Sequence, residues 1–213
     1  MWVIIQSSRQ DRIKRQGVAL VVQKAIAENI TEYSCISERL MSVSFDTTEG
    51  ILTIIQVYAP DSSYPEADID EFYDSLQQHI NSLPSKNKYI LLGDFNAKVG
   101  EDQHENWSTV VGQYGLGTAN GRGLQLLQFC AINDLLIVNT IYRHSNKIRV
   151  TWISPDGNNR NQIDFIIIQS SWKSKVKNSS AYHSASIGSD HFMVIANIKL
   201  QCQTTQETIA KKI

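Results

Sequence analysis

The sequence has little cysteine, no long apolar run and almost no net charge, and each absence excludes a class of protein. Its three cysteines, Cys35, Cys130 and Cys202, lie far apart along the chain. Their spacing fits no zinc site, and a small, odd number is typical of a reducing compartment rather than of a disulfide-rich secreted protein. We therefore expect plain thiols without a metal-binding role.

The longest apolar runs, such as residues 18–22 and 163–168, are far shorter than the roughly 20 residues that span a bilayer. The N-terminus lacks the basic leader and the long apolar core of a signal peptide. We therefore expect an intracellular protein that is not secreted, makes no membrane contact and is nuclear where it is functional.

The formal net charge is -1, so bulk electrostatics do not indicate a nucleic-acid-binding protein. The basic residues nevertheless form three groups: Arg9, Arg12, Lys14 and Arg15; Arg143, Lys147 and Arg149; and Lys173, Lys175 and Lys177. Such a group is most often a solvated loop or strand face. Its meaning depends on where it lies relative to a site.

With 213 residues, of which 42% are hydrophobic, the chain can bury the core of one sizeable domain. We expect this domain over residues 1–200, followed by a polar tail at 201–213. Strand-like segments dominate it: residues 3–6, 18–23, 40–45, 51–58, 89–92, 135–138, 149–153, 162–168 and 192–200. Many strands and few helices predict a layered α/β or α+β sandwich.

Two helices are predicted between these strands. The first spans residues 68–83, with Asp68 as its N-cap, and it ends before Pro84. The second spans residues 121–133 and follows the N-cap Asn120. Four residues of the second helix are expected to face inward: Leu124, Leu127, Cys130 and Ala131.

The most informative segment is residues 89–96, an apolar strand that leads through Gly93 to Asp94 and Asn96. These two residues are two positions apart, so on an extended backbone their side chains share one face. A carboxylate and a carboxamide at the end of an apolar strand can bind a hard cation, a water molecule or a phosphate oxygen.

Other polar residues lie beside apolar strands in the same way: Tyr58, Thr151, Asp164, Asp190 and His191. Each alone has a structural explanation, such as a turn cap or a satisfied hydroxyl, and only their repetition indicates a site. An Asp paired with a His can fix the imidazole tautomer. Carboxylates beside a carboxamide, without thiolate ligands, favour magnesium or manganese over zinc.

Taken in order, residues 58–60, 93–96, 151–152, 162–165 and 189–191 resemble the endonuclease/exonuclease/phosphatase superfamily, which includes DNase I and the apurinic/apyrimidinic endonucleases. Residues 93–100, 139–140 and 151–164 are most similar to the endonuclease domains of LINE-type retrotransposons and to the related craniofacial development protein 2-like sequences. The resemblance extends over nearly the whole chain. It implies a four-layer α/β (α+β) sandwich of two mixed β-sheets flanked by helices, and hydrolysis of DNA phosphodiesters with Mg²⁺ or Mn²⁺ as the only cofactor.

The resemblance also implies roles for single residues. Asp94 would orient or deprotonate the attacking water, and Asn96 would help to position water and phosphate. His191 would stabilise the charge on the scissile phosphate, with Asp164 as its orienting carboxylate, and Tyr58 would donate to a phosphate oxygen.

Asp190 is expected on the metal side of this site, together with Asp94. The residues expected to contact DNA are Thr151, Asn161, Arg143, Lys147 and Arg149. The protein is expected to act as a monomer with a tendency to aggregate.

The family pattern begins with a strand carrying an Asn and a later strand that ends in a metal-binding Glu. This sequence starts after both strands. Glu38 cannot replace that Glu, because it lies after the strand at residues 18–22, which is the wrong side of that strand. We therefore expect an N-terminally truncated domain with weak metal affinity, unpaired sheet edges, marginal stability and low solubility. Three functions remain open: a magnesium-dependent endonuclease, a degenerate remnant that binds nucleic acid without cutting it, and a small-molecule phosphoesterase.

Overall fold

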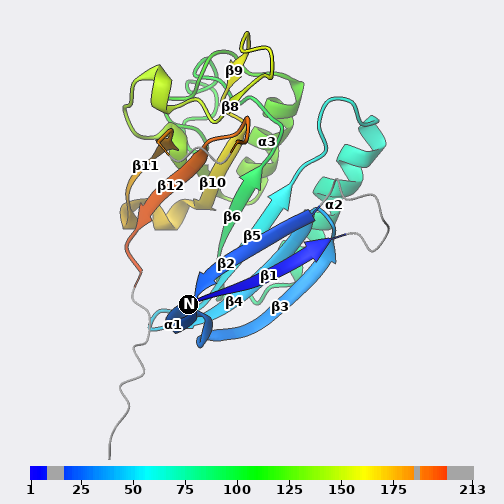
Figure 1. Ribbon diagram of the computed structural model, residues 1–213, viewed down its shortest axis with the longest axis vertical. Helices are drawn as coiled ribbons and strands as arrows, with labels where there is room; N and C mark the ends of the chain where they lie inside the picture. The colour runs from blue at the N-terminus through cyan, green and yellow to red at the C-terminus, as the bar shows by residue number, and fades with distance from the viewer. Residues whose placement is uncertain (9–16, 185–187, 201–213) are drawn as a thin grey trace, which may run out of the picture.

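A six-stranded mixed sheet forms the centre of the computed structural model, which describes residues 1–8, 17–184 and 188–200 (Figure 1). Its strands, in spatial order, are β3 (Ile30–Ser37), β4 (Leu40–Thr47), β5 (Gly50–Tyr58), β6 (Lys88–Asp94), β10 (Asp164–Gln169) and β7 (Leu135–Ile137). β5 and β6 run parallel, and the other neighbouring strands run antiparallel. The last residues of β5 and β6 therefore meet the first residue of β10 at one end of the sheet.

Helices α2 (Glu66–Ser82) and α3 (Gly121–Ile132) cover one face of this sheet (Figure 1). The buried residues of α2 recur at helical spacing: Ile69, Phe72, Leu76 and Ile80. Both predicted helices are confirmed, and the Asn120 side chain accepts the Gly123 N–H as the predicted cap. The N-cap of α2 is Pro65, so Asp68 as the cap is wrong. Leu124 is 45% exposed, so its predicted inward position is also wrong.

The register of α3 explains the second error. Leu126, Leu127, Phe129 and Cys130 are its buried larger residues, whereas Ala131 is exposed and also departs from the prediction. The predicted burial of Leu127 and Cys130 is confirmed, and Leu126 and Phe129 are buried in place of Leu124 and Ala131. Four of the twelve residues of α3 are leucine or phenylalanine, and periodicity alone does not choose among them.

Two separate hairpins cover the opposite face of the central sheet. β1 (Trp2–Ser8) and β2 (Gly17–Gln23), followed by the short α1 (Lys24–Ala27), pack on β4 through Val18 and Val22. β11 (Val176–Tyr182) and β12 (Met193–Ile198) pack on the β10 side through Val176 and Val194. The mixed α/β class is confirmed. In the described part of the chain, however, the expected second sheet consists of these two hairpins, and their outer faces expose large apolar side chains.

The remaining elements are short. β8 (Trp152–Ile153) and β9 (Arg160–Asn161) form a small hairpin near the site. The 3₁₀ helices of the described residues are η1 (Val138–Thr140), η2 (Asn146–Ile148) and η3 (Ser170–Lys175). The predicted strand at 149–153 is reduced to β8. The expected tail at 201–213 lies outside the described residues. No helix in the described ranges is both long enough and apolar enough to cross a membrane.

Candidate active site

Gly93 sets the position of Asp94 at the end of β6. Its φ is +147°, and a Cβ atom built there would lie 1.9 Å from the Val57 carbonyl oxygen of β5. Only glycine allows the two parallel strands to approach this closely. The Ala59 N–H then donates to the Asp94 carbonyl oxygen at 2.8 Å, which fixes the end of β6 against the loop that follows β5.

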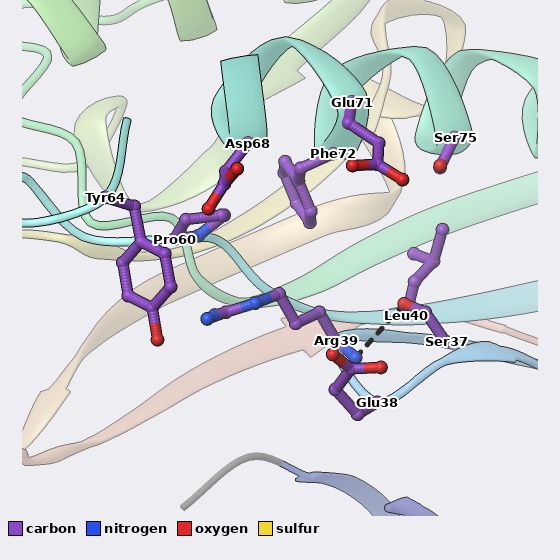
Figure 2. Close-up of a pocket in the computed structure, with 10 residues that line it drawn as sticks. All are labelled: Ser37, Glu38, Arg39, Leu40, Pro60, Tyr64, Asp68, Glu71, Phe72 and Ser75. Carbon is purple, nitrogen blue, oxygen red and sulfur yellow. Dashed lines mark hydrogen bonds between the residues drawn. The ribbon is translucent and has the colours of Figure 1, made fainter. Parts of the chain in front are cut away.

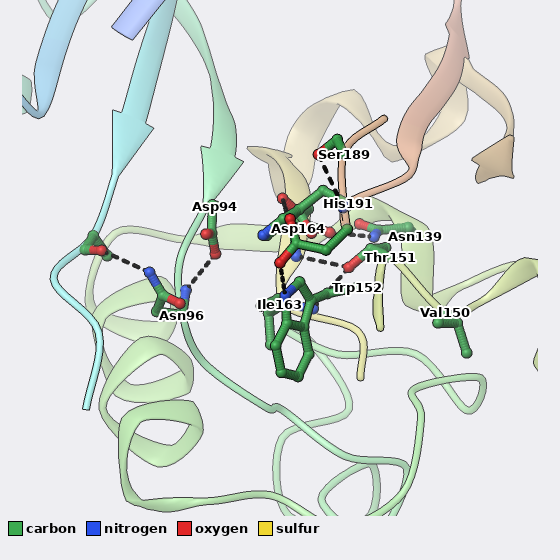
Figure 3. A network of polar contacts seen from close by, with 12 residues as sticks. Asp94, Asn96, Asn139, Val150, Thr151, Trp152, Ile163, Asp164, Ser189 and His191 are labelled. Carbon is green, nitrogen blue, oxygen red and sulfur yellow. Dashed lines mark hydrogen bonds and ion pairs between the residues drawn. The ribbon is translucent and has the colours of Figure 1, made fainter. Parts of the chain in front are cut away.

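Asn96 ties the same two segments together (Figure 3). Its backbone N–H donates to Asp94 Oδ1 at 2.8 Å, and its side-chain amide donates to the Ala59 carbonyl oxygen at 2.9 Å. The strand ends at Asp94, and Asn96 has a left-handed φ of +48°. The prediction that both residues share one face of an extended strand is therefore wrong, although they do lie at one site.

Asp94, Asp164 and His191 form the central cluster of the site (Figure 3). Asp94 and Asp164 are direct partners in the antiparallel pairing of β6 with β10. His191 Nδ1 lies 3.1 Å from both carboxylate oxygens of Asp164. One possible ligand atom from each residue lies within 4.8 Å of the others, so the sequence-based grouping of these three residues is matched by their positions.

The cluster perturbs the proton affinity of its members. Burial and the neighbouring Asp164 carboxylate raise the pKa of Asp94 to about 7, against the opposing effect of the Asn96 N–H and His191. Burial alone would lower the pKa of His191. The hydrogen bond to Asp164 and the surrounding carboxylates outweigh it, so that pKa is raised. The pKa of Tyr58 is also raised, mainly by burial and by Asp94.

Thr151 supports this cluster by binding the backbone next to Asp164. Its side chain is only 1% exposed, and its hydroxyl oxygen accepts the N–H groups of Ile163 at 3.0 Å and Asp164 at 3.1 Å. These bonds fix the start of β10 and thus the Asp164 carboxylate. The structure thus gives Thr151 a positioning role, and its predicted contact with DNA stays a prediction.

Asn139 is a second supporting residue, to which the sequence assigned no role. Its amide nitrogen donates to the Asp164 carbonyl oxygen at 2.9 Å, and its amide oxygen accepts the Ile166 N–H at 3.2 Å. The side chain is buried. Because β7 pairs only with residues 167–169 of β10, the Asn139 amide supplies hydrogen-bond partners for the backbone at the start of β10. A polar residue directly after the apolar strand at 135–138 was the available signal.

Asp190 lies beside the cluster and is exposed. Its Oδ2 accepts the Trp152 indole N–H at 2.9 Å, and its backbone carbonyl accepts the Ile153 N–H at 3.0 Å. These bonds attach the β8–β9 hairpin to the segment that carries His191. Among the described residues, the cluster whose ligand atoms lie close enough to hold a metal ion consists of Asp94, Asp164 and His191. Asp190 is not part of it, and metal binding by Asp190 stays a prediction.

The expected DNA-binding residues occupy different environments. Arg143 and Lys147 are exposed, and Asn161 is partly exposed on β9. The Arg149 side chain is only 11% exposed and holds Glu101 at 3.4 Å, together with the Gly115 carbonyl oxygen. Arg149 therefore anchors the loop before α3, and its predicted contact with a phosphate stays a prediction. The basic group at 9–15 lies outside the described residues.

The donor set of the cluster fits a hard divalent cation. Two carboxylates supply the oxygen ligands that Mg²⁺ and Mn²⁺ prefer, and an imidazole nitrogen is also acceptable to Mn²⁺. Burial and, after it, the neighbouring Asp164 carboxylate raise the pKa of Asp94, and a bound cation would relieve the repulsion between the two carboxylates.

Comparison with known proteins agrees with this geometry. Residues 52–195 match the family model described as endonuclease-reverse transcriptase. The chain is 36% identical to craniofacial development protein 2 of Bos taurus over 199 residues, which cover 93% of this chain and 33% of that protein. It thus spans about a third of the length of this curated relative.

Two solved structures share the fold. The endonuclease domain of TRAS1, a telomere-specific non-LTR retrotransposon, superposes with a TM-score of 0.66 and 17% identity, covering 94% of this chain and 79% of that one. The 3′ phosphatase NExo from Neisseria, bound to a product DNA hairpin, gives a TM-score of 0.64 and 16% identity, covering 93% and 79%. The chain therefore belongs to the endonuclease-reverse transcriptase family, within the endonuclease/exonuclease/phosphatase superfamily of DNase I-like folds.

Proposed function

We propose that this protein hydrolyses phosphodiester bonds in DNA with the help of Mg²⁺ or Mn²⁺. The observation that carries the proposal is the cluster of Asp94, Asp164 and His191 at one end of the central sheet. Members of this family generally depend on a divalent metal, and the cluster has the ligands to hold one.

His191 is the residue suited to the phosphate. Asp164 engages its Nδ1, so Nε2 is the nitrogen that can face a substrate. The raised pKa of His191 favours the imidazolium form, which donates to a phosphate oxygen and stabilises the negative charge that develops on it.

Asp94 is the residue suited to the attacking water. Its pKa of about 7 belongs to the metal-free site. A bound cation would lower that pKa, and the carboxylate would then accept a hydrogen bond from the water and orient it. Asn96 keeps this carboxylate in place through its backbone N–H. When bound to Asp94 and Asp164, the divalent cation would neutralise charge on the phosphate and lower the pKa of water.

DNA is favoured as the substrate over a small phosphoester. The exposed Arg143 and Lys147 follow η1, which contacts β10, the strand that begins with Asp164. Cations near this strand suit an extended polyanion. One structural neighbour is a nuclease-fold enzyme bound to a DNA hairpin. The competing function, DNA binding without cleavage, differs only in the outcome of a cleavage assay.

Nicking of supercoiled plasmid tests the proposal. Wild-type protein is expected to convert supercoiled to open-circular DNA with Mg²⁺ or Mn²⁺ and to stop in EDTA. Asp94→Ala and His191→Ala should each lower the nicking rate by at least about 100-fold. Lys177→Ala, which changes an exposed cation on β11, serves as the control and should cleave normally. Metal-independent nicking, or equal rates in all four proteins, would contradict the proposal.

A further inference from the structure

A second cavity lies beside β7, the edge strand of the central sheet. Its volume is about 330 Å³, and its lining comes from four parts of the chain: residues 104–108, 112–114, 141–142 and 173. Lys173 belongs to η3, which follows the last residue of β10, whereas Asp164 is the first residue of that strand. At about 3.3 Å per residue, the two ends of β10 are roughly 17 Å apart. The cavity is therefore separate from the candidate active site.

Hydrogen bonds to Thr140 fix two walls of this cavity against each other. The Gly112 N–H donates to Thr140 Oγ1 at 2.8 Å, and the Tyr114 N–H donates to the Thr140 carbonyl oxygen at 2.9 Å. A Cβ atom built at Gly112 would lie 2.3 Å from the same carbonyl oxygen, so only glycine allows this approach. Thr140 ends η1, and Tyr142 follows two residues later. The loop that carries Tyr114 and the segment that carries Tyr142 are thus held together.

His104 is oriented in a similar way. Its Nδ1 lies 2.8 Å from the Val111 carbonyl oxygen. A carbonyl oxygen only accepts hydrogen bonds, so Nδ1 carries the proton in this contact. Among the described residues, no hydrogen bond engages the Nε2 atom of His104, which is left for another partner.

Lys173 and Tyr142 add donors that the protein itself does not use. No residue in the described ranges forms a hydrogen bond or ion pair with the Lys173 ammonium group or with the Tyr142 hydroxyl. The Tyr142 ring packs against the apolar cluster that includes Val138 and Val176. This burial raises the pKa of Tyr142, so its hydroxyl stays protonated and can donate.

The charge of this cavity differs from that of the cavity between α2 and the β3–β4 turn (Figure 2). Three carboxylates and one guanidinium line the cavity in Figure 2: Glu38, Asp68, Glu71 and Arg39. An excess of carboxylates disfavours an anion there. In the described part of the chain, no carboxylate lines the cavity beside β7, where a lysine and an imidazole meet neutral donors. Convergent donors of this kind suit a phosphate group, and the partly exposed rings of Tyr114 and Tyr142 suit a flat base beside it.

We propose that the cavity beside β7 binds a phosphate ester, with a mononucleotide as its smallest ligand. Lys173 and His104 contact the phosphate group, and Tyr114 and Tyr142 supply ring surface for the attached base. A free nucleotide and a nucleotide within a nucleic-acid strand offer this same chemistry. The site is distinct from the cluster at Asp94, and binding to it does not require cleavage.

Imidazole signals in ¹H–¹⁵N NMR spectra test the proposal, because His104 reports on the cavity and His191 on the candidate active site. Deoxythymidine 5′-monophosphate, added in EDTA, should shift the His104 signal in a saturable way at millimolar concentration. Thymidine, which lacks the phosphate, should bind at least about tenfold more weakly. Lys173→Gln should also weaken nucleotide binding about tenfold. His104→Gln assigns the signal, and thermal melting checks that each variant is folded.

Lys177→Ala is the matched control, because it removes an exposed cation that does not line the cavity. A His104 signal that does not move, or an equal loss for Lys173→Gln and Lys177→Ala, overturns the inference. A shift confined to His191 overturns it as well. If the cavity binds a thymidine hexanucleotide more tightly than the mononucleotide, its ligand is a nucleic-acid strand, and the reverse order assigns it to a free nucleotide. None of these results depends on plasmid nicking, so the inference and the proposed function can fail separately.

Discussion

Stability and chemistry compete at Asp94. Its carboxyl group has a folded-state pKa of about 7, against 3.8 for the unconstrained group. Between about pH 4 and pH 7 the folded protein therefore holds a proton that the unfolded chain does not. Stability is expected to fall as the pH rises through this window, and the loss is complete above it.

Asp94→Asn removes this penalty and keeps an acceptor for the Asn96 N–H. We expect the variant to be more stable than wild type at pH 8 in EDTA, by about 1–4 kcal/mol, and to lose this advantage near pH 4. Urea unfolding at several pH values measures the difference. If the stability difference between the variant and wild type were the same at pH 4 and at pH 8, the pKa of Asp94 would not be raised in the folded protein.

Thr151 provides a second residue-scale prediction. Thr151→Val keeps the shape of the side chain but leaves the N–H groups of Ile163 and Asp164 without their acceptor. The free energy of unfolding should fall by about 2–3 kcal/mol, whereas Thr151→Ser should lose about 1 kcal/mol. If Thr151→Val unfolded like wild type but bound DNA more weakly, the direct phosphate contact expected from the sequence would be correct.

The parallel pairing of β5 with β6 is the structural element that assembles the site, and Gly93 permits it. Gly93→Ala would force a Cβ atom against the Val57 carbonyl at a φ that disfavours alanine. We expect a loss of more than about 3 kcal/mol in thermal or urea unfolding. Gly121→Ala, in the open first turn of α3, is the control and should be neutral or slightly stabilising. Equal stability of the two variants would contradict this view of the β5–β6 contact.

The sequence predicted the elements that carry a clear apolar pattern and missed those that do not. β5, β6 and β10 carry runs of apolar residues in the sequence, and the buried residues of α2 have helical spacing, so all four were predictable. β3 is largely exposed at the sheet edge, and β11 carries Lys177, Asn178 and two serines, so neither shows a strand pattern. Both form because neighbouring strands supply hydrogen-bond partners, which the local sequence does not reveal.

The site followed the same rule. Asp94 ends one apolar strand and Asp164 begins another, so both were identifiable from their position, and they do pair. The supporting places of Thr151 and Asn139, and the burial of Arg149, depend on contacts between segments that are distant in sequence. A polar residue near a site can face the substrate or hold the backbone, and only the tertiary structure distinguishes the two.

At the scale of the whole molecule, the outer faces of the β1–β2 and β11–β12 hairpins are exposed. On β1–β2, Trp2, Ile4 and Val21 are 61%, 65% and 56% exposed, and Ile4 and Val21 are cross-strand partners. Met193 and Tyr182 are similarly exposed on β11–β12. Apolar faces of this kind favour association with other surfaces.

We therefore expect concentration-dependent self-association of this chain, measured by sedimentation velocity. The double variant Ile4→Thr, Val21→Thr should reduce it, because threonine keeps strand preference and lowers the apolar area. Leu124→Gln, on the outer face of α3, should have little effect because that residue lies away from both hairpins. A wild type that stays monomeric over the whole concentration range would refute this expectation.

The rate at which His191→Ala cleaves plasmid, relative to wild type, tests the central claim most directly. The measurement is made under single-turnover conditions, with protein in excess over DNA and with Mg²⁺ or Mn²⁺ present, so weaker binding does not mask the chemical step. If Asp94, Asp164 and His191 form a metal-dependent phosphodiesterase site, wild type cleaves and the variant is slower by at least about 100-fold. A wild type that binds the plasmid without cleaving it, or a variant that cleaves at the wild-type rate, would contradict the claim.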